Sequence, residues 1–208
     1  MDNRFILEQK LNKDFSVVVG VDEVGRGPLA GPVVSAAVYF EKPIEESWWE
    51  EIRDSKKVSE KKREALAEKI LEHAHIGIGI ASVEQIEKIN ILQASLSAMN
   101  LAVADLLKSL TIEHSSQVYV LVDGNNQIPG LSYKQMPLVK GDGLVHSIAA
   151  ASIVAKVTRD NLMVDLDKKF PQYGFAQHKG YGTLIHREAI KQYGLSSAHR
   201  SSFCRNII

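Results

Sequence analysis

The 208-residue sequence has a single cysteine, no net formal charge and no long uninterrupted apolar run. One cysteine, Cys204, excludes an internal disulfide and a cysteine-rich metal site. No apolar run approaches the roughly 18 residues that a membrane span needs, and the polar N-terminus, Met1 to Arg4, lacks the apolar core of a signal peptide. A chain of this length folds without a disulfide or metal staple. We therefore expect a cytoplasmic protein.

The zero net charge conceals an uneven distribution of charge along the chain. Residues 1–132 hold 14 Lys and Arg against 20 Asp and Glu, whereas residues 133–208 hold 11 against 5. A basic half beside an acidic half is typical of proteins with a polyanionic partner. The alternative is that both charged surfaces are simply solvated.

Short apolar runs alternate with helical patterns. The runs are β-branched and apolar almost throughout, which predicts strands covered on both faces of a sheet. They fall at residues 16–21, 33–40, 76–81 and 118–122, and the helical patterns fall at 59–73, 92–110, 143–170 and 183–192. The helix that starts near residue 143 opens with many small residues, so we expect it to lie close against the sheet. Strands mixed with helices of this length predict an α/β layer fold.

Acidic residues stand at the boundaries of these elements. Asp22 and Glu23 follow the first strand run, Asp123 follows the fourth, and Asp142 precedes the small-residue helix. Strand ends are where sites gather in α/β sheets, so the four carboxylates are candidates for one site. Each also has a structural alternative, which is a loop start for the first two, a turn for Asp123 and a helix N-cap for Asp142.

Carboxylates that converge in this way need a cation between them. Two of them about 5 Å apart at an effective dielectric of about 20 repel by about 3 kcal/mol. Hard oxygen ligands without cysteine or paired histidine select Mg²⁺ or Mn²⁺. A zinc site is not expected, because His73 and His75 have no third ligand at a usual spacing.

A glycine- and proline-rich stretch follows the first acidic pair. Residues 25–32 lack the Gly-Lys-Ser/Thr of a phosphate-binding Walker loop and the spacing of a dinucleotide-binding fingerprint. Glycines on both sides of Arg26 allow the backbone to approach a ligand with its N–H groups exposed. Proximity to Asp22 and Glu23 favours such a role over the alternative, a plain turn between two strands.

Five segments of the chain carry a resemblance to a known family. They are DEVGRGPLAGPV at 22–33, DSKKVS at 54–59, KGD at 140–142, SIAAASIVAKVTRD at 147–160 and HKGYGT at 178–183. In these segments, which keep the family's order, the chain resembles bacterial ribonuclease HII over residues 16–200. One segment alone is a weak signal, but coincidence does not explain five in order.

The resemblance implies an RNase H-like fold, with a mixed five-stranded sheet flanked by helices and a small C-terminal helical segment. It implies a catalytic domain over residues 1–170 and a substrate-binding segment over 171–208. It also implies metal-dependent cleavage of the RNA strand of RNA–DNA hybrids. Duplex DNA that contains ribonucleotides would be incised 5′ of the ribonucleotide, which leaves a 3′-hydroxyl and a 5′-phosphate. The default oligomeric state is a monomer.

The resemblance also assigns roles to residues. The catalytic, metal-binding acids of the family fall on Asp22, Glu23, Asp123 and Asp142, and two divalent ions, Mg²⁺ or Mn²⁺, are implied with substrate. The loop that senses the ribose 2′-hydroxyl falls on Gly25, Arg26 and Gly27, and the tyrosine that senses the RNA–DNA junction falls on Tyr181. The chain departs from many relatives at Leu144, where they carry lysine, and this puts one basic substrate contact in doubt.

Basic side chains are expected to meet the phosphates of the substrate without reading its sequence. They are Arg26, Lys56, Lys57, Lys179, Arg187, Lys191, Arg200 and Arg205. The alternative for Lys57, Lys61 and Lys62 is a solvated helix face. Two other functions stay open, a hybrid-binding module without catalysis and a two-metal nuclease of the resolvase or integrase kind.

Overall fold

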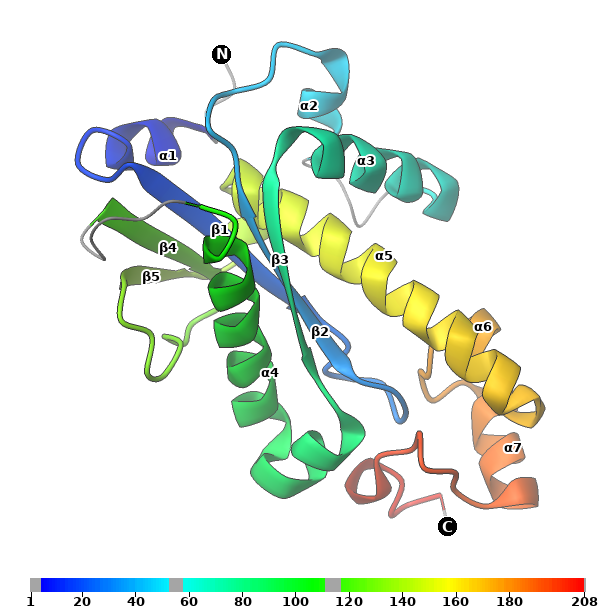
Figure 1. Cartoon of the computed structure of the whole chain (residues 1–208). Helices are drawn as coiled ribbons and strands as arrows, with labels where there is room; N and C mark the ends of the chain where they lie inside the picture. The colour runs from blue at the N-terminus through cyan, green and yellow to red at the C-terminus, as the bar shows by residue number, and fades with distance from the viewer. Residues whose placement is uncertain (1–4, 53–57, 111–116, 208) are drawn as a thin grey trace.

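The computed structural model describes residues 5–52, 58–110 and 117–207, and it contains a five-stranded sheet with helices on both faces (Figure 1). The strands are β1 (Val17–Val24), β2 (Val33–Tyr39), β3 (His75–Ala81), β4 (Val118–Asp123) and β5 (Lys134–Leu138). Their order in the sheet is β3-β2-β1-β4-β5. The pairs β1–β2 and β2–β3 are antiparallel, whereas β1–β4 and β4–β5 are parallel. The predicted mixed sheet is thus confirmed.

The sequence patterns predicted four of these strands and missed β5. Its residues KQMPL are polar or half-buried and include a proline, so β5 lacks the apolar run that identified the other strands. The first strand is longer than predicted. It continues to Val24, so Asp22 and Glu23 lie within the end of β1 instead of following it.

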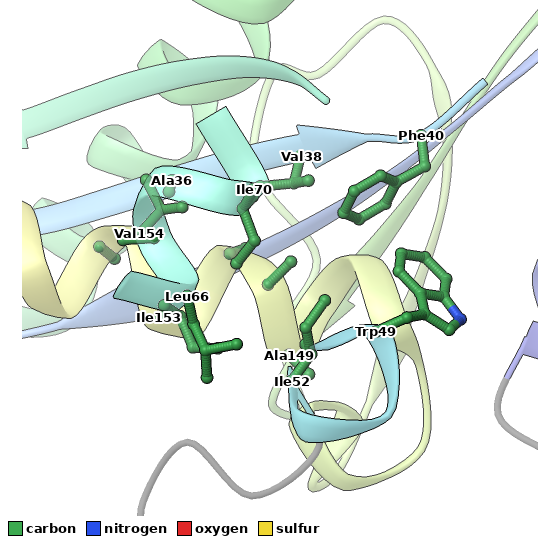
Figure 2. Close-up of a cluster of buried hydrophobic side chains, with 14 of the residues drawn as sticks. Ala36, Val38, Phe40, Trp49, Ile52, Leu66, Ile70, Ala149, Ile153 and Val154 are labelled. Carbon is green, nitrogen blue, oxygen red and sulfur yellow. The ribbon is translucent and has the colours of Figure 1, made fainter. Parts of the chain in front are cut away.

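One face of the sheet is covered by α2 (Ser47–Glu51), α3 (Glu60–His73) and α5 (His146–Lys169). Figure 2 shows Phe40 and Trp49 beside aliphatic side chains from β2, α3 and α5. The predicted start of α3 is confirmed, because the Ser59 hydroxyl accepts a hydrogen bond from the backbone N–H of Lys62.

The small residues of α5 let it lie directly on β1. A Cβ atom at Gly20 would lie 2.4 Å from the backbone nitrogen of Ile148, so only glycine allows this approach. The predicted close contact between helix and sheet is therefore confirmed. The helix begins later than predicted, with Val145 as its N-cap, and Asp142 lies in a short 3₁₀ turn, η3 (Gly141–Gly143). The helix N-cap alternative for Asp142 is therefore wrong.

The opposite face is covered by α4 (Val83–Leu107), which begins nine residues before the amphipathic pattern predicted from position 92. The helix is interrupted at Asn90, whose backbone has φ 66° and ψ 166°. By length and composition α4 would be able to cross a membrane. It instead packs closely on β3, where Gly77 and Gly79 leave room for the backbone of Ala98 and Ala102.

The C-terminal segment lies at the far end of α5, beside the loop between β1 and β2 (Figure 1). It contains η4 (Pro171–Tyr173), α6 (Phe175–His178), α7 (Leu184–Tyr193) and η5 (Ser201–Phe203). The end of α5 and the start of α7 fall close to the predicted ranges, with Pro171 after α5 and the Thr183 hydroxyl accepting the N–H of His186 at the start of α7. A small cluster of buried side chains, with Phe175 at its centre, joins this segment to Met163 of α5 and Ala30 of the loop. A further helix, α1 (Phe5–Leu11), precedes β1.

Candidate active site

The parallel pairing of β1 and β4 brings two acidic residues together. Val21 pairs with Val122, so Asp22 and Asp123, the next residue on each strand, lie at the same edge of the sheet. They and Glu23 line a pocket of about 350 Å³. The other lining residues are Val24, Arg63, Ser152, Lys156 and Tyr181. Three of the four predicted acids, and the predicted tyrosine, therefore share one pocket.

Asp22 is the most buried of the three acidic residues. Its side chain accepts a hydrogen bond of 2.7 Å from the backbone N–H of Glu23, and the residue is only 5% exposed. Burial raises the pKa of Asp22 well above its ordinary value, and the charges of Glu23 and Asp123 raise it further. Burial also raises the pKa of Glu23, against the opposing effect of Arg26, whose guanidinium lies 3.3 Å from the Glu23 carboxylate. The pocket therefore concentrates negative charge that is poorly solvated.

The fourth predicted acid lies next to the pocket. The Asp123 carboxylate accepts a hydrogen bond of 2.7 Å from the backbone N–H of Gly141, which fixes η3 beside the end of β4. Asp142 follows Gly141 and is half-buried, but it is not among the residues that line the pocket. Leu144, in the position where many relatives carry lysine, is 53% exposed.

The carboxylate oxygens are ligands of the kind that a hard divalent cation prefers, although their spacing in this structure is not that of a closed metal site. Within residues 5–52, 58–110 and 117–207, no three His, Cys, Asp or Glu side chains are gathered tightly enough to hold a metal ion. The charges of Glu23 and Asp123 nevertheless raise the pKa of Asp22, and the charge of Asp123 also raises the pKa of Glu23, a repulsion that a divalent cation relieves. An all-oxygen donor set of this kind fits Mg²⁺ or Mn²⁺.

The predicted 2′-hydroxyl-sensing loop faces the tyrosine. Gly25 has φ 97°, and a Cβ atom there would lie 2.2 Å from the Nε atom of Arg159, so both its conformation and its surroundings require glycine. A Cβ atom at Gly27 would lie 4.0 Å from the Tyr181 ring. The ring itself is 45% exposed. Gly27 of the loop thus lies next to Tyr181, which lines the pocket of the carboxylates.

Sequence reasoning missed three side chains of the pocket, Arg63, Ser152 and Lys156. The hydroxyl of Ser152 bonds to the Asp22 carboxylate and lowers its pKa, a smaller effect than burial. The Nζ atom of Lys156 lies 2.7 Å from the Asp160 carboxylate. Ser152 and Lys156 are one helical turn apart, so they lie on the same side of α5. This spacing is a sequence signal for two polar side chains on one face, but the many small residues around them suggested only close packing.

The basic side chains that were predicted to contact phosphate lie in different environments. Lys56 and Lys57 lie outside the described residues. Lys179 is engaged within the protein, since its ammonium group donates to the carbonyl of Ala176 at 2.6 Å and lies 3.3 Å from the Glu60 carboxylate. The prediction for Arg200 is wrong, because that side chain is fully buried and donates to backbone carbonyls. Among the predicted contacts, Arg26, Arg187, Lys191 and Arg205 are exposed, and their phosphate contacts stay predictions.

Comparison with known proteins agrees with this arrangement. The family model described as Ribonuclease HII matches residues 19–206. The chain is 51% identical over its full length to the ribonuclease HII of Fusobacterium nucleatum, of which it covers 94%. It is 48% identical to that of Clostridioides difficile, over 95% of this chain and 73% of the relative. The chain belongs to the ribonuclease HII family. It is therefore a ribonuclease H of type HII.

Solved structures similar to this chain have the same fold. The ribonuclease HII in the PCNA:RNase HII complex of Archaeoglobus fulgidus superposes with a TM-score of 0.70 at 26% identity, over 88% of this chain and 93% of that one. The ribonuclease H2 of Pyrococcus horikoshii OT3 gives 0.69 at 27% identity, over 92% and 96%. A Bst-RNase HIII solved in complex with Mn²⁺ gives 0.68 at 18% identity, over 92% and 66%, and it supports the fold alone.

Proposed function

We propose that this ribonuclease H cleaves the RNA strand of RNA–DNA hybrids and incises duplex DNA on the 5′ side of embedded ribonucleotides. The observation that carries the proposal is one pocket that holds Asp22, Glu23 and Asp123 on one side and Tyr181 on another. Such a pocket combines a place for cations with a place for a sugar. A binding module without catalysis gains nothing from three carboxylates that repel a polyanionic ligand.

The carboxylates are the proposed ligands of two divalent ions, Mg²⁺ or Mn²⁺. Asp22, Glu23 and Asp123 would hold them, with Asp142 completing the set from η3. When bound, such ions activate water and stabilise the leaving oxygen of an in-line displacement, which gives a 3′-hydroxyl and a 5′-phosphate. Asp22, whose pKa both neighbouring carboxylates raise, would be a ligand of these ions at the buried side of the pocket.

The surface around Gly27 and Tyr181 is the proposed site of sugar recognition. Peptide groups of Gly25, Arg26 and Gly27 would bond to the ribose 2′-hydroxyl, which is the group that distinguishes RNA from DNA. The Tyr181 ring, close to Gly27, would stack on the neighbouring deoxyribose, where a second 2′-hydroxyl would clash. The 2′-hydroxyl is thus recognised but does not attack the phosphate.

The test uses a labelled DNA duplex with one embedded ribonucleotide, the matched all-DNA duplex and an RNA–DNA hybrid, each with Mg²⁺ or Mn²⁺ and with a chelator. We expect metal-dependent cuts in the hybrid and a cut 5′ of the ribonucleotide. Equal cutting of the all-DNA duplex would favour a two-metal nuclease of the resolvase or integrase kind. Tight binding without any cutting would favour the hybrid-binding module.

Three further features stay proposals. We infer a monomer and a cytoplasmic place of action. We also infer that residues 171–208 act as a substrate-binding segment on a catalytic domain formed by residues 1–170. The exposed cations of α7, Arg187 and Lys191, support that role of the segment.

A further inference from the structure

The side chain of Arg200 is a buried cation that the proposed chemistry does not use. It is 0% exposed. Its Nε and Nη2 atoms donate to the Gly31 carbonyl at 3.0 and 2.7 Å, and Nη2 also donates to the Gly25 carbonyl at 2.6 Å. Its Nη1 atom donates to the carbonyls of Arg26 and Pro28, both at 2.9 Å. All five N–H bonds of the guanidinium therefore end on the loop between β1 and β2.

The backbone around Arg200 is joined to the same loop. The N–H of Gly31 donates to the Ala198 carbonyl, and the N–H of Arg200 donates to the Leu29 carbonyl, each at 2.8 Å. On the other side, the hydroxyls of Ser201 and Ser202 donate to the carboxylate of Glu87 at 2.7 and 2.6 Å. Since Glu87 lies on α4, the segment around Arg200 is held between α4 on one side and the β1–β2 loop on the other.

The direction of these hydrogen bonds determines which way the loop's peptide groups point. The described backbone has no cis peptide bond, and in a trans peptide the carbonyl and the following N–H point in opposite directions. Because the carbonyls of Gly25 and Arg26 point toward Arg200, the N–H groups of Arg26 and Gly27 point away from it. Within the part of the chain that the structure describes, neither N–H has a protein acceptor. Gly27 is also the residue that approaches the Tyr181 ring.

A second arginine closes the loop's inner side. Arg159 of α5 donates to the carbonyls of Ala30 and Pro32 at 3.1 and 3.0 Å, and to that of Lys179 at 2.9 Å. Burial lowers the pKa of Arg200 to about 9, and the charge of Arg159 adds to this effect. Two cations close together in the protein interior cost free energy of folding. Their arrangement is therefore better explained by a functional role than by a gain in stability.

We propose that Arg200 is a positioning residue for sugar recognition, which turns the N–H groups of Arg26 and Gly27 away from the interior, toward the surface beside Tyr181 where the ribose 2′-hydroxyl would lie. This inference rests on the proposed function, because it presumes that the loop reads the sugar. It predicts that the chain's ability to distinguish ribose from deoxyribose depends on a side chain that never touches the substrate.

The test is the variant Arg200→Lys, which keeps the charge but has three donors instead of five. The readouts are kcat and KM on the duplex with one ribonucleotide, and the ratio of cutting there to cutting in the all-DNA duplex. We expect kcat to fall by about a hundredfold, as misplacement by about 1 Å can cause. We expect the KM for the duplex to change little and the ratio to fall toward one.

A control variant separates positioning from loss of stability. Leu106→Ala opens a cavity beside Gly77 of β3. Leu106 belongs to the buried cluster beneath α4 and is not among the residues that line the pocket. At a temperature where both variants are folded, we expect Leu106→Ala to keep the wild-type kcat despite a lower Tm. If kcat falls in both variants in proportion to their Tm, the inference is overturned.

The remaining outcomes distinguish this inference from the proposed function. If the wild type incises the ribonucleotide duplex and Arg200→Lys does so equally well, only the inference fails. If the wild type does not incise, the proposed function fails and the inference with it. If Arg200→Lys does not fold, Glu87→Ala replaces it, because it removes the anchor of Ser201 and Ser202. We then expect a smaller loss of kcat with KM retained, and an unchanged kcat overturns the inference.

Discussion

At the scale of single residues, Asp123 combines a structural and a proposed catalytic role. Its carboxylate accepts the N–H of Gly141 and adds negative charge to the pocket around Asp22. Asparagine keeps an acceptor oxygen for Gly141 but removes the charge, so Asp123→Asn separates the two roles. Repulsion against Asp22 also falls in this variant, so folding does not suffer.

We therefore expect Asp123→Asn to fold and to bind an RNA–DNA hybrid like the wild type, but to lose cleavage. The loss should exceed the roughly 10–100-fold that removal of an outer-shell partner of a metal costs. Cleavage assays with Mg²⁺, thermal unfolding and hybrid binding by fluorescence anisotropy test this. Unchanged turnover would remove Asp123 from the proposed ligand set.

A second residue, Glu8 of α1, makes stability depend on pH. Its side chain accepts the N–H of Ser147 at 3.2 Å and is buried, and burial raises its pKa from 4.5 to about 7. The folded state thus holds this proton more tightly than the unfolded state. The stabilisation is complete below pH 4.5 and is lost as the pH rises through about 7.

Replacement of Glu8 by glutamine should remove this dependence. At pH 8 we expect Glu8→Gln to be more stable than the wild type by about 3 kcal/mol, the free energy that corresponds to the shift. Urea unfolding at pH 5 and at pH 8 measures both proteins. If the variant and the wild type lose the same stability between these two pH values, the burial of a charged Glu8 is not the cause.

At the level of secondary-structure elements, α4 contains a backbone interruption at Asn90 that the sequence pattern does not reveal. Asn90 has φ 66°, and its side-chain oxygen accepts the N–H groups of Leu92 and Gln93 at 3.0 and 3.1 Å. Asn90 therefore caps the second part of the helix. This explains why the amphipathic pattern becomes clear only from residue 92.

Because of this interruption, alanine at position 90 should destabilise the protein more than glycine does, which is the reverse of the usual order in a helix. Alanine is the better helix former, but here it loses the cap and is forced into a left-handed conformation, so Asn90→Ala should cost about 1–3 kcal/mol. Asn90→Gly should cost only about a few tenths of a kcal/mol, because glycine adopts that conformation freely. Thermal and urea unfolding compare the two. An alanine variant as stable as the wild type would contradict the local geometry.

Elements with a strong pattern were predictable, and elements fixed by tertiary contacts were not. The small residues of α5 correctly predicted its close approach to the sheet, since only small side chains permit it. Strand β5 was missed because it pairs with β4 through its backbone while its side chains are polar or half-buried. Arg200 was wrongly predicted to be a phosphate-binding surface cation, because nothing in its local sequence indicates that a distant loop encloses it.

At the scale of the whole molecule, the uneven charge distribution predicts binding that depends on salt. Arg187 and Lys191 of α7 are exposed, as contact with a phosphate backbone requires. With six or more phosphate contacts, hybrid affinity should fall by roughly a thousandfold between about 50 and 200 mM salt. A flat affinity over this range would contradict electrostatic binding.

One substitution tests where on the molecule that binding occurs. Arg187→Ala should reduce the slope of log affinity against log salt by about 1, as loss of one phosphate contact does. Lys168→Ala is the control, since Lys168 is exposed on α5 but lies 2.8 Å from the Asp165 carboxylate. The slope for this variant should match that of the wild type.

Local periodicity and residue chemistry were sufficient to predict the α/β class, four of the strands, the major helices and the types of residue at the candidate site. That Asp22 and Asp123 share one pocket with Asp142 beside it, and that Arg200 faces inward, could be learned only from the folded chain. The physical reason is that such distances depend on how β1 pairs with β4 and on how the C-terminal segment packs against the β1–β2 loop. Those contacts join residues that lie far apart in the chain.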